Sequence, residues 1–120
     1  LLEEIEIGKQ GVIFYLAEEA VNNARKHAQA PHIWVRLHTL EKEIVLLEIQ
    51  DDGIGFNVDE ITRAYDERGS LGMVNLRERS ELINGFLNIL SAPGKGTKIQ
   101  VFIPLSEEAV DRMHRALNKE

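Results

Sequence analysis

Hydrophobic residues recur at helical spacing near the start of the chain, over residues 11–28. Steps of about 100° per residue bring them onto one stripe of a helix, which holds Ile13, Leu16, Ala17, Ala20, Ala24 and Ala28. Pro31 disfavours helical geometry in the residue before it, so we expect the helix to end in this region. The pattern therefore predicts an amphipathic helix with one buried face.

The pattern then changes from helical spacing to alternation. Ile33, Val35 and Leu37 alternate with polar or aromatic residues, which is the period of a half-buried strand. Residues 44–49 are more continuously apolar and predict a more deeply buried strand. The segment between them, residues 40–43, is mostly charged, so we expect the chain to reverse there and form an antiparallel pair.

The second half of the chain repeats this order of a helix and two strands. Residues 71–84 predict a helix, and Gly85 is a suitable C-terminal stop for it. Residues 86–90 predict a strand, residues 93–96 a turn and residues 97–103 a final strand. The strands therefore lie next to strands along the chain, which is typical of an antiparallel arrangement.

The end of the chain predicts one more element. Residues 106–120 indicate a short polar helix with Ser106 as its N-cap. The whole order of elements predicts an α+β fold: a two-layer α/β sandwich with a mixed, mostly antiparallel sheet covered on one face by helices. We expect residues 1–105 to form the domain and residues 106–120 to form a helical tail.

Composition narrows the class of protein. The chain has 120 residues, of which 43% are hydrophobic and 28% charged, and this balance indicates one globular domain. It has no cysteine, which excludes a disulfide scaffold, a thiol nucleophile, a zinc–thiolate site and an iron–sulfur cluster. The net charge of -6 argues against a nucleic-acid-binding surface, and no apolar run is as long as a membrane span.

A polar stripe lies beside the apolar face of the first predicted helix. Glu19, Asn23 and Lys26 are spaced i, i+4, i+7, so one face carries a carboxylate, an amide oxygen and an ammonium. These groups suit a bound metal–phosphate, because the amide oxygen can bind Mg²⁺, the ammonium phosphate, and the carboxylate can orient or deprotonate an attacking group. From spacing alone, a solvated helix face is the commoner interpretation. Glu18 and Asn22 have the same spacing on a side that we expect to be more exposed.

Three glycine-containing segments are further candidates. Residues 51–55, Asp-Asp-Gly-Ile-Gly, end a strand with a carboxylate that could accept a hydrogen bond from an exocyclic amine, although Asp-Gly is also a common turn. Residues 69–72, Gly-Ser-Leu-Gly, precede a helix whose free N–H groups form either a phosphate cradle or a plain turn. Residues 94–97, Gly-Lys-Gly-Thr, taken alone favour a hairpin turn. His32 and His38 are interpreted as structural.

Taken together and in this order, these segments resemble the ATP-binding domain of bacterial sensor histidine kinases, in the Bergerat-type superfamily that includes DNA gyrase. Residues 19–27 resemble its asparagine-containing helix motif, residues 51–55 its first glycine motif and residues 69–73 its second. Residues 76–79, Leu-Arg-Glu-Arg, resemble the subfamily of nitrate sensors and the membrane-fluidity sensor DesK. The resemblance covers residues 11–105 and implies the Bergerat ATP-binding fold.

The resemblance implies a role for each matching residue. Asn23 is expected to coordinate Mg²⁺ between the phosphates, and Glu19 to be the acid/base residue that orients the accepting histidine. Lys26 is expected to contact phosphate, and Asp51 to bind the adenine amino group with Thr97 helping through a water. Residues 57–68 would form a mobile lid. The other expected ATP-binding residues are His27, Gly53, Gly55, Gly69, Leu71, Gly72 and Met73.

The implied activity is transfer of the γ-phosphoryl group of ATP to a histidine on a separate dimerisation and phosphoacceptor domain, with ATP and Mg²⁺ as cofactors. None of the four histidines matches the phosphoacceptor pattern, so we expect that domain to lie before Leu1.

The implied partners are this helical domain and a response regulator, without nucleic acid. The implied location is cytoplasmic, in a full-length protein that is a homodimer, with or without a membrane anchor; the isolated domain would be a monomer. A serine kinase of the anti-sigma type, and a nucleotide-binding module that drives assembly without phosphotransfer, remain alternatives.

Overall fold

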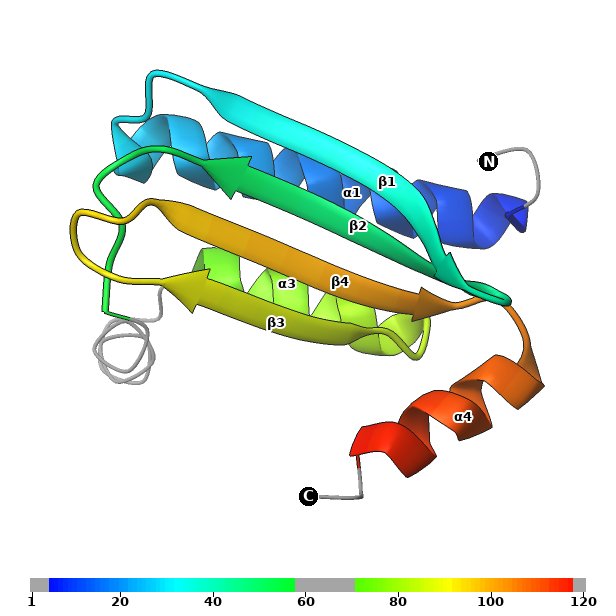
Figure 1. The fold of residues 1–120 in the computed structure, drawn as a ribbon. Helices are drawn as coiled ribbons and strands as arrows, with labels where there is room; N and C mark the ends of the chain where they lie inside the picture. The colour runs from blue at the N-terminus through cyan, green and yellow to red at the C-terminus, as the bar shows by residue number, and fades with distance from the viewer. Residues whose placement is uncertain (1–4, 58–70, 118–120) are drawn as a thin grey trace.

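The computed structural model describes residues 5–57 and 71–117, which form a sheet, a helical layer on one side of it and a further helix (Figure 1). The first helix, α1 (Ile7–Asn23), continues as a π-helical turn, η2 (Ala24–Ala28). A hairpin of β1 (Ile33–Glu41) and β2 (Ile44–Asp51) follows. The remaining elements are α3 (Leu71–Leu82), β3 (Phe86–Ser91), β4 (Thr97–Pro104) and α4 (Glu107–Leu117).

The four strands that the structure describes form one sheet in the order β1-β2-β4-β3. All three pairings between them are antiparallel, which confirms the α+β fold and the predicted hairpin between the first two strands. The reversal is tighter than predicted, because β1 runs on to Glu41 and the turn uses Lys42 and Glu43, the latter with φ 58°. Since β2 and β4 are antiparallel neighbours, the end of β2 lies beside the start of β4.

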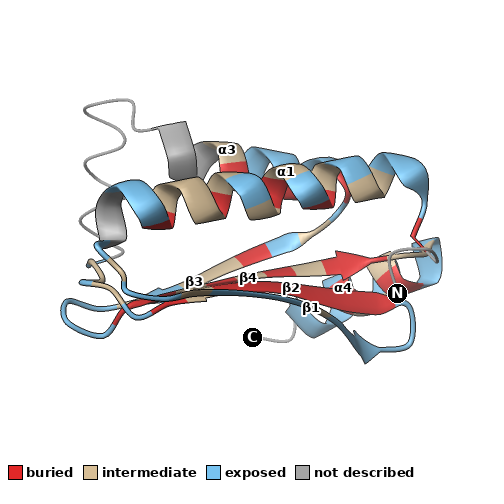
Figure 2. Cartoon of the chain, turned by 90° about the horizontal axis from the view of Figure 1, so that it is seen from above, coloured by how far each residue is buried: buried red, intermediate tan, exposed pale blue. Residues whose placement is uncertain are grey.

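The main core lies between the sheet and the layer formed by α1 and α3, where the buried residues of both layers face each other (Figure 2). Leu16 and Ala20 of α1 are 0% and 1% exposed and belong to the same cluster as Leu47 and Ile49 of β2. Full burial of one leucine stabilises the fold by about 1.5–3 kcal/mol. The apolar stripe predicted for the first helix therefore faces the core from Ile13 to Ala20, with Ala17 only half-buried.

The first helix begins at Ile7, earlier than the hydrophobic pattern predicts. Contacts distant from that pattern hold its first turn. Ile5 is 3% exposed within the core, and the side-chain amide of Gln10 donates to its carbonyl oxygen at 2.7 Å. Lys9 Nζ donates to the carbonyl oxygen of Pro104 at 3.0 Å, so the start of α1 lies at the far end of β4 from Thr97.

The end of α3 corrects the role expected for Gly85. Asn84, and not Gly85, adopts the left-handed conformation, with φ 58°. Gly85 instead lies at a close contact, because a Cβ there would lie 3.1 Å from the carbonyl oxygen of Ser80 and 3.2 Å from that of Phe102. Asparagine tolerates left-handed geometry better than most residues, so Asn84 can turn the chain into β3.

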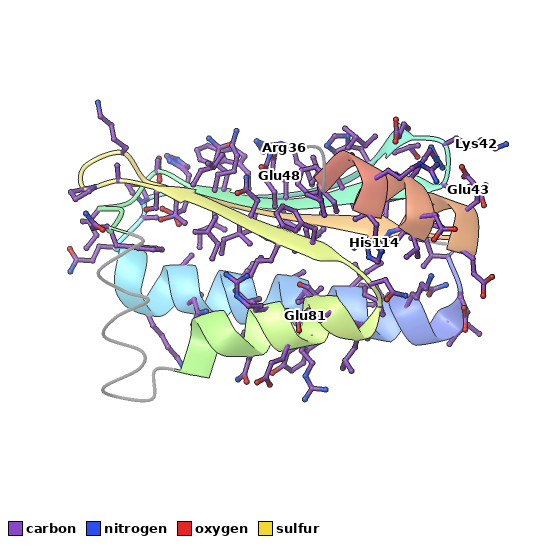
Figure 3. All side chains as sticks on the ribbon, turned by 90° about the horizontal axis from the view of Figure 1, so that it is seen from below. Arg36, Lys42, Glu43, Glu48, Glu81 and His114 are labelled. Atoms are coloured by element: carbon purple, nitrogen blue, oxygen red, sulfur yellow. The ribbon has the colours of Figure 1, made fainter. Side chains whose placement is uncertain are left out.

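Helix α4 packs on the face of the sheet that is turned away from α1 and α3 (Figures 2 and 3). Ala109 and Met113 form a small apolar cluster with Ile44 there. The Arg112 guanidinium donates to the carbonyl oxygen of Lys42 at 2.6 Å, which ties the helix to the turn between β1 and β2. The predicted tail is therefore a docked helix at the end of the sheet away from Thr97.

A row of polar side chains crosses the same sheet face in register, from β1 through β2 and β4 to β3. Glu48 lies at its centre and is 9% exposed, with Arg36 at 3.5 Å and the Gln100 side-chain amide at 2.9 Å (Figure 3). Asn88 Nδ2 donates to Gln100 Oε1 at 3.0 Å and completes the row. The buried carboxylate is thus paired on both sides, as a buried charge must be.

Candidate functional site

The segments singled out from the sequence gather at one end of the sandwich (Figure 1). The end of α1, the end of β2, the hairpin between β3 and β4 and the start of α3 all lie there. Antiparallel pairing places Asp51 opposite Thr97, and Thr97 opposite Ser91. The fold thereby brings together motifs that are far apart along the chain.

Asp51, Thr97 and Ser91 form a polar row across three neighbouring strands. They continue the strand positions that face α1 and α3, because side chains alternate along a strand. Asp51 is 7% exposed and Thr97 is 8% exposed. Directly opposite residues of antiparallel strands have Cβ atoms about 4.5–5.5 Å apart, so the carboxylate and the hydroxyl are neighbours. The Gly53 N–H donates to Asp51 Oδ1 at 2.8 Å and holds the carboxylate in place.

Ser91 is a member of this row that the sequence analysis did not identify. Its Oγ lies 2.8 Å from Thr97 Oγ1, accepts the Phe56 N–H at 2.9 Å and donates to the Gly96 carbonyl oxygen at 2.9 Å. One local signal was present: the alternation of Leu87 and Ile89 brings a polar residue onto the inward face at position 91. Its contact with Phe56, 35 residues earlier, could not be read from the sequence.

Two glycines of the predicted motifs are required by close backbone contacts. Gly55 has φ 66°, and a Cβ there would lie 2.1 Å from the carbonyl oxygen of Ala92. Gly96 has φ 74°, and a Cβ there would lie 2.3 Å from the carbonyl oxygen of Asp51. Residues 94–97 are therefore more than a hairpin turn, since they pack directly against the first glycine motif.

The polar stripe of α1 reaches this end of the molecule. Glu19 and Asn23 are half-buried, whereas Glu18 is exposed. Asn22 is half-buried as well. Burial therefore separates the two glutamates as expected, and it does not separate the two asparagines.

Lys26 and His27 lie in the π-helical turn η2 and not in regular α-helix. A π-helix forms i→i+5 hydrogen bonds, so the spacing of 100° per residue no longer applies beyond Asn23. The expectation that Glu19, Asn23 and Lys26 share one α-helical stripe is therefore wrong for Lys26, which is exposed.

The second glycine motif is described in part. Leu71, Gly72 and Met73 form the first turn of α3, at the same end of the sandwich. Gly69 and residues 58–68 of the expected lid lie outside the described residues.

His32 anchors the loop that follows Asp51. Its backbone N–H donates to Asp52 Oδ1 at 2.8 Å, and its ring Nδ1 lies 2.9 Å from Asp52 Oδ2. This side-chain hydrogen bond from His32 holds the pKa of Asp52 below its usual value of 3.8. The His32 ring also stacks on Trp34, with ring centroids 5.7 Å apart. The residue therefore joins the start of β1 to the first glycine motif.

A hollow of about 460 Å³ opens beside the end of the sheet, a size within the usual range for small-molecule sites. It has no α1 residue in its lining, and its residues come from both faces of the sheet end, because Gln50, Leu90 and Lys98 alternate with the inward-facing Asp51, Ser91 and Thr97. The lining residues are Gln50, Asp51, Ile89, Leu90, Ser91, Ala92, Lys95, Gly96, Thr97 and Lys98.

Within residues 5–57 and 71–117, no three His, Cys, Asp or Glu residues lie together as a metal site. Across the same part of the chain, no helix has both the length and the apolar character that a membrane span requires.

Known proteins resemble this chain in sequence. The family described as "Histidine kinase-, DNA gyrase B-, and HSP90-like ATPase" matches residues 8–107. An uncharacterized sensor-like histidine kinase of Chloroflexus aurantiacus is 42% identical over 106 residues, which are 87% of this chain and 18% of that protein. The sensor histidine kinase YdfH of Bacillus subtilis is 37% identical over 98 residues, which are 82% of this chain and 23% of that protein. The chain thus spans under a quarter of these relatives.

Solved structures agree with the sequence matches. The blue-light activated histidine kinase of Erythrobacter litoralis aligns with a TM-score of 0.71 and 26% identity, over 87% of this chain and 33% of that one. The ATP binding domain of PrrB from Mycobacterium tuberculosis shares the fold, with a TM-score of 0.66 and 21% identity, over 82% of this chain and 70% of that one. The chain therefore belongs to the histidine kinase-, DNA gyrase B- and HSP90-like ATPase family, as an ATP-binding domain of the sensor histidine kinase type.

Proposed function

We propose that this chain binds ATP with Mg²⁺ and transfers the γ-phosphoryl group to a histidine on a separate dimerisation and phosphoacceptor domain. The observation that supports this most is the nearly buried pair of Asp51 and Thr97, opposite each other at the end of the sheet where α1 also ends. A response regulator as downstream partner, a homodimeric full-length protein and a cytoplasmic location belong to the same proposal.

The base would bind at the sheet side of the site. Asp51 offers carboxylate oxygens to the exocyclic amino group of adenine, and the Gly53 N–H keeps that carboxylate fixed before the nucleotide arrives. Thr97, opposite Asp51, adds a hydroxyl oxygen beside this carboxylate. Gly53 and Gly55 shape the wall, because a side chain at Gly55 would collide with the β3–β4 hairpin.

The phosphates would bind toward α1 and the start of α3. Asn23 lies at the end of α1 and offers a neutral amide oxygen, and Lys26 in η2 offers an ammonium to phosphate. The first turn of α3, with Leu71 and Gly72, adds backbone N–H groups that have no partner within the helix and favour anions. One protein oxygen fits Mg²⁺, which usually keeps waters and phosphate oxygens as its other ligands. When bound, Mg²⁺ neutralises charge on the phosphates.

Glu19 would act at the reacting end of the site. It lies one helical turn before Asn23 and is half-buried, so its carboxylate can accept a hydrogen bond from the imidazole of the incoming histidine. In the transfer, the bond from the γ-phosphorus to the oxygen of ADP breaks and a bond to an imidazole nitrogen forms. Catalysis of this kind depends mostly on positioning and charge neutralisation.

The test supplies the chain with a separate phosphoacceptor helix pair from a sensor histidine kinase and ATP labelled at the γ-phosphate. A label on histidine that acid removes and alkali does not supports the proposal. Alkali-labile label on serine would instead favour an anti-sigma-type serine kinase. Saturable ATP binding without any label would favour a module whose nucleotide drives assembly.

Glu19→Gln tests the acid/base role. We expect ATP affinity to be kept and phosphotransfer to fall by about 10²–10⁴-fold, which is the usual contribution of a positioned proton-transfer group. Glu18→Gln on the exposed side of the same helix is the matched control and should leave transfer unchanged. Loss of ATP binding in Glu19→Gln, or an equal loss of transfer in the control, contradicts the assignment.

Asn23→Asp tests the metal ligand. The added negative charge beside the phosphates should disturb Mg–ATP binding, measured by calorimetry with and without Mg²⁺. Asn22→Asp is the control, and it matters here because burial does not distinguish the two asparagines. Unchanged affinity and transfer in Asn23→Asp would remove this residue from the site.

A further inference from the structure

The hydroxyl of Ser91 is surrounded by hydrogen-bond partners on three sides. The Phe56 N–H donates to it at 2.9 Å, the Gly96 carbonyl oxygen lies 2.9 Å away, and Thr97 Oγ1 lies 2.8 Å away. These partners come from the residue that follows the first glycine motif, from the β3–β4 hairpin and from the first residue of β4. Ser91 therefore joins the three segments that form the sheet side of the site.

Counting protons assigns a direction to each of these bonds. A serine hydroxyl has one proton and two acceptor lone pairs. The amide of Phe56 can only donate and the carbonyl of Gly96 can only accept, so the Ser91 proton points to Gly96. The second lone pair of Ser91 then accepts the proton of Thr97. All three bonds form together only in this arrangement.

The Thr97 hydroxyl is consequently committed as a donor to Ser91, and only its lone pairs can serve a ligand. Asp51, opposite Thr97 on β2, is a carboxylate and is likewise an acceptor. Its Oδ1 already accepts from Gly53, so the charge is held in place. Two neighbouring, nearly buried groups thus offer acceptors side by side and no donor.

We infer that Ser91 is a positioning residue that sets base specificity: by holding the proton of Thr97, it makes this part of the site require a hydrogen-bond donor on the base. The inference rests on the proposed function, since it names which feature of the bound nucleotide is read. A 6-amino group supplies such a donor. A 6-oxo group would place its acceptor oxygen beside the acceptor oxygens of Asp51 and Thr97, which leaves buried polar atoms without hydrogen-bond partners.

The test compares the affinities of ATP, inosine triphosphate and purine riboside triphosphate for the 120-residue chain by calorimetry. Inosine triphosphate carries a 6-oxo group and a proton on N1, and the purine nucleotide has no substituent at position 6. We expect the wild type to prefer ATP over both. In Ser91→Ala, the Thr97 hydroxyl can rotate and donate to a 6-oxo group, so the preference for ATP over inosine triphosphate should fall about tenfold.

The ratio of the affinity for ATP to that for inosine triphosphate distinguishes a positioning role from a general structural defect, because such a defect weakens the binding of both nucleotides alike. Thr97→Val removes the hydroxyl and should lower the same ratio, while the double variant Ser91→Ala/Thr97→Val should lower it no further. Ser91→Thr keeps a hydroxyl and should restore the wild-type ratio. Ser106→Ala is the matched control, because the Oγ of Ser106 accepts the Ala109 N–H at 3.1 Å at the other end of the sheet.

Three results would overturn the inference. They are an unchanged ratio in Ser91→Ala, a parallel loss of affinity for all three nucleotides, and additive effects of the Ser91 and Thr97 variants. Should Ser91→Ala not fold, Ser91→Cys is measured instead, since a thiol has nearly the same volume and is a much weaker donor and acceptor. Absence of any nucleotide binding by the wild type would refute the proposed function itself, and with it the inference.

Discussion

The close approach of Gly96 to Asp51 can be tested with a pair of glycine variants in one hairpin. Gly94 and Gly96 both have a positive φ, of 78° and 74° respectively. A Cβ at Gly94 would meet nothing within 4 Å, whereas a Cβ at Gly96 would lie 2.3 Å from the carbonyl oxygen of Asp51. Gly94→Ala and Gly96→Ala therefore both place an alanine at positive φ, and only Gly96→Ala adds a collision.

The expected losses of stability follow from the backbone strain and from the collision. A non-glycine residue in left-handed geometry costs about 1–2 kcal/mol, and this is the whole expected loss for Gly94→Ala. Real Cβ contacts essentially never fall below 3.0 Å, so in Gly96→Ala the paired strands β2 and β4 must separate locally. Forced overpacking of this kind adds about 1–3 kcal/mol. The separation also displaces Asp51 from Thr97, so ATP affinity should fall in Gly96→Ala alone.

Urea denaturation gives the two stability losses, and calorimetric titration with ATP gives the two affinities. In a thermal scan, 1 kcal/mol corresponds to a shift in Tm of about 4 °C for a domain of this size. Equal losses of stability in the two variants, with ATP affinity intact in both, would refute the reasoning, because the contact with Asp51 would then have no consequence.

Three other variants test the core, the loop anchor and α4. Leu47→Ala, at a position 2% exposed, should lower the free energy of unfolding by about 2–5 kcal/mol in urea titration, whereas Leu90→Ala, at 52% exposed, should change it little. The hydrogen bond from His32 lowers the pKa of Asp52, so it stabilises the fold above pH 3.8. The difference in the free energy of unfolding between wild type and Asp52→Asn should therefore disappear as the pH falls through this lowered pKa. Arg112→Ala should cost about 0.5–1.5 kcal/mol and speed proteolysis of α4, with ATP affinity unchanged.

The sequence predicted the elements because local signals encode them, whereas the roles of the site residues remain predictions. The continuous apolar run of β2 predicts its burial, and the order of helices and strands predicts the two layers. The alternation over β1 overstates the burial of that edge strand, because Val35 is 50% exposed. The roles of Asp51 and Thr97 came from the resemblance to a family. The structure adds that strand pairing places the two residues opposite each other.

What the sequence did not predict depends on contacts between distant segments. The spacing of hydrophobic residues does not indicate the π-helical turn that contains Lys26. Ile5 lies in the core, where the side-chain amide of Gln10 donates a hydrogen bond to its carbonyl oxygen. Ser91 looks like an ordinary strand end until Phe56 and Gly96 are packed around its hydroxyl. Such residues owe their importance to packing, which no local pattern records.

The hydrogen bond between Lys9 and Pro104 bears on how the chain can be attached to a surface in an assay. It holds the start of α1 at the opposite end of the sandwich from Asn23, and a helix of 17 residues separates the two by about 25 Å. A tag or sensor surface attached through the amino-terminal end would therefore lie at the end of the sandwich opposite the candidate site. Immobilised chains should keep their nucleotide-facing end turned toward solvent and should give the same affinities as free chains.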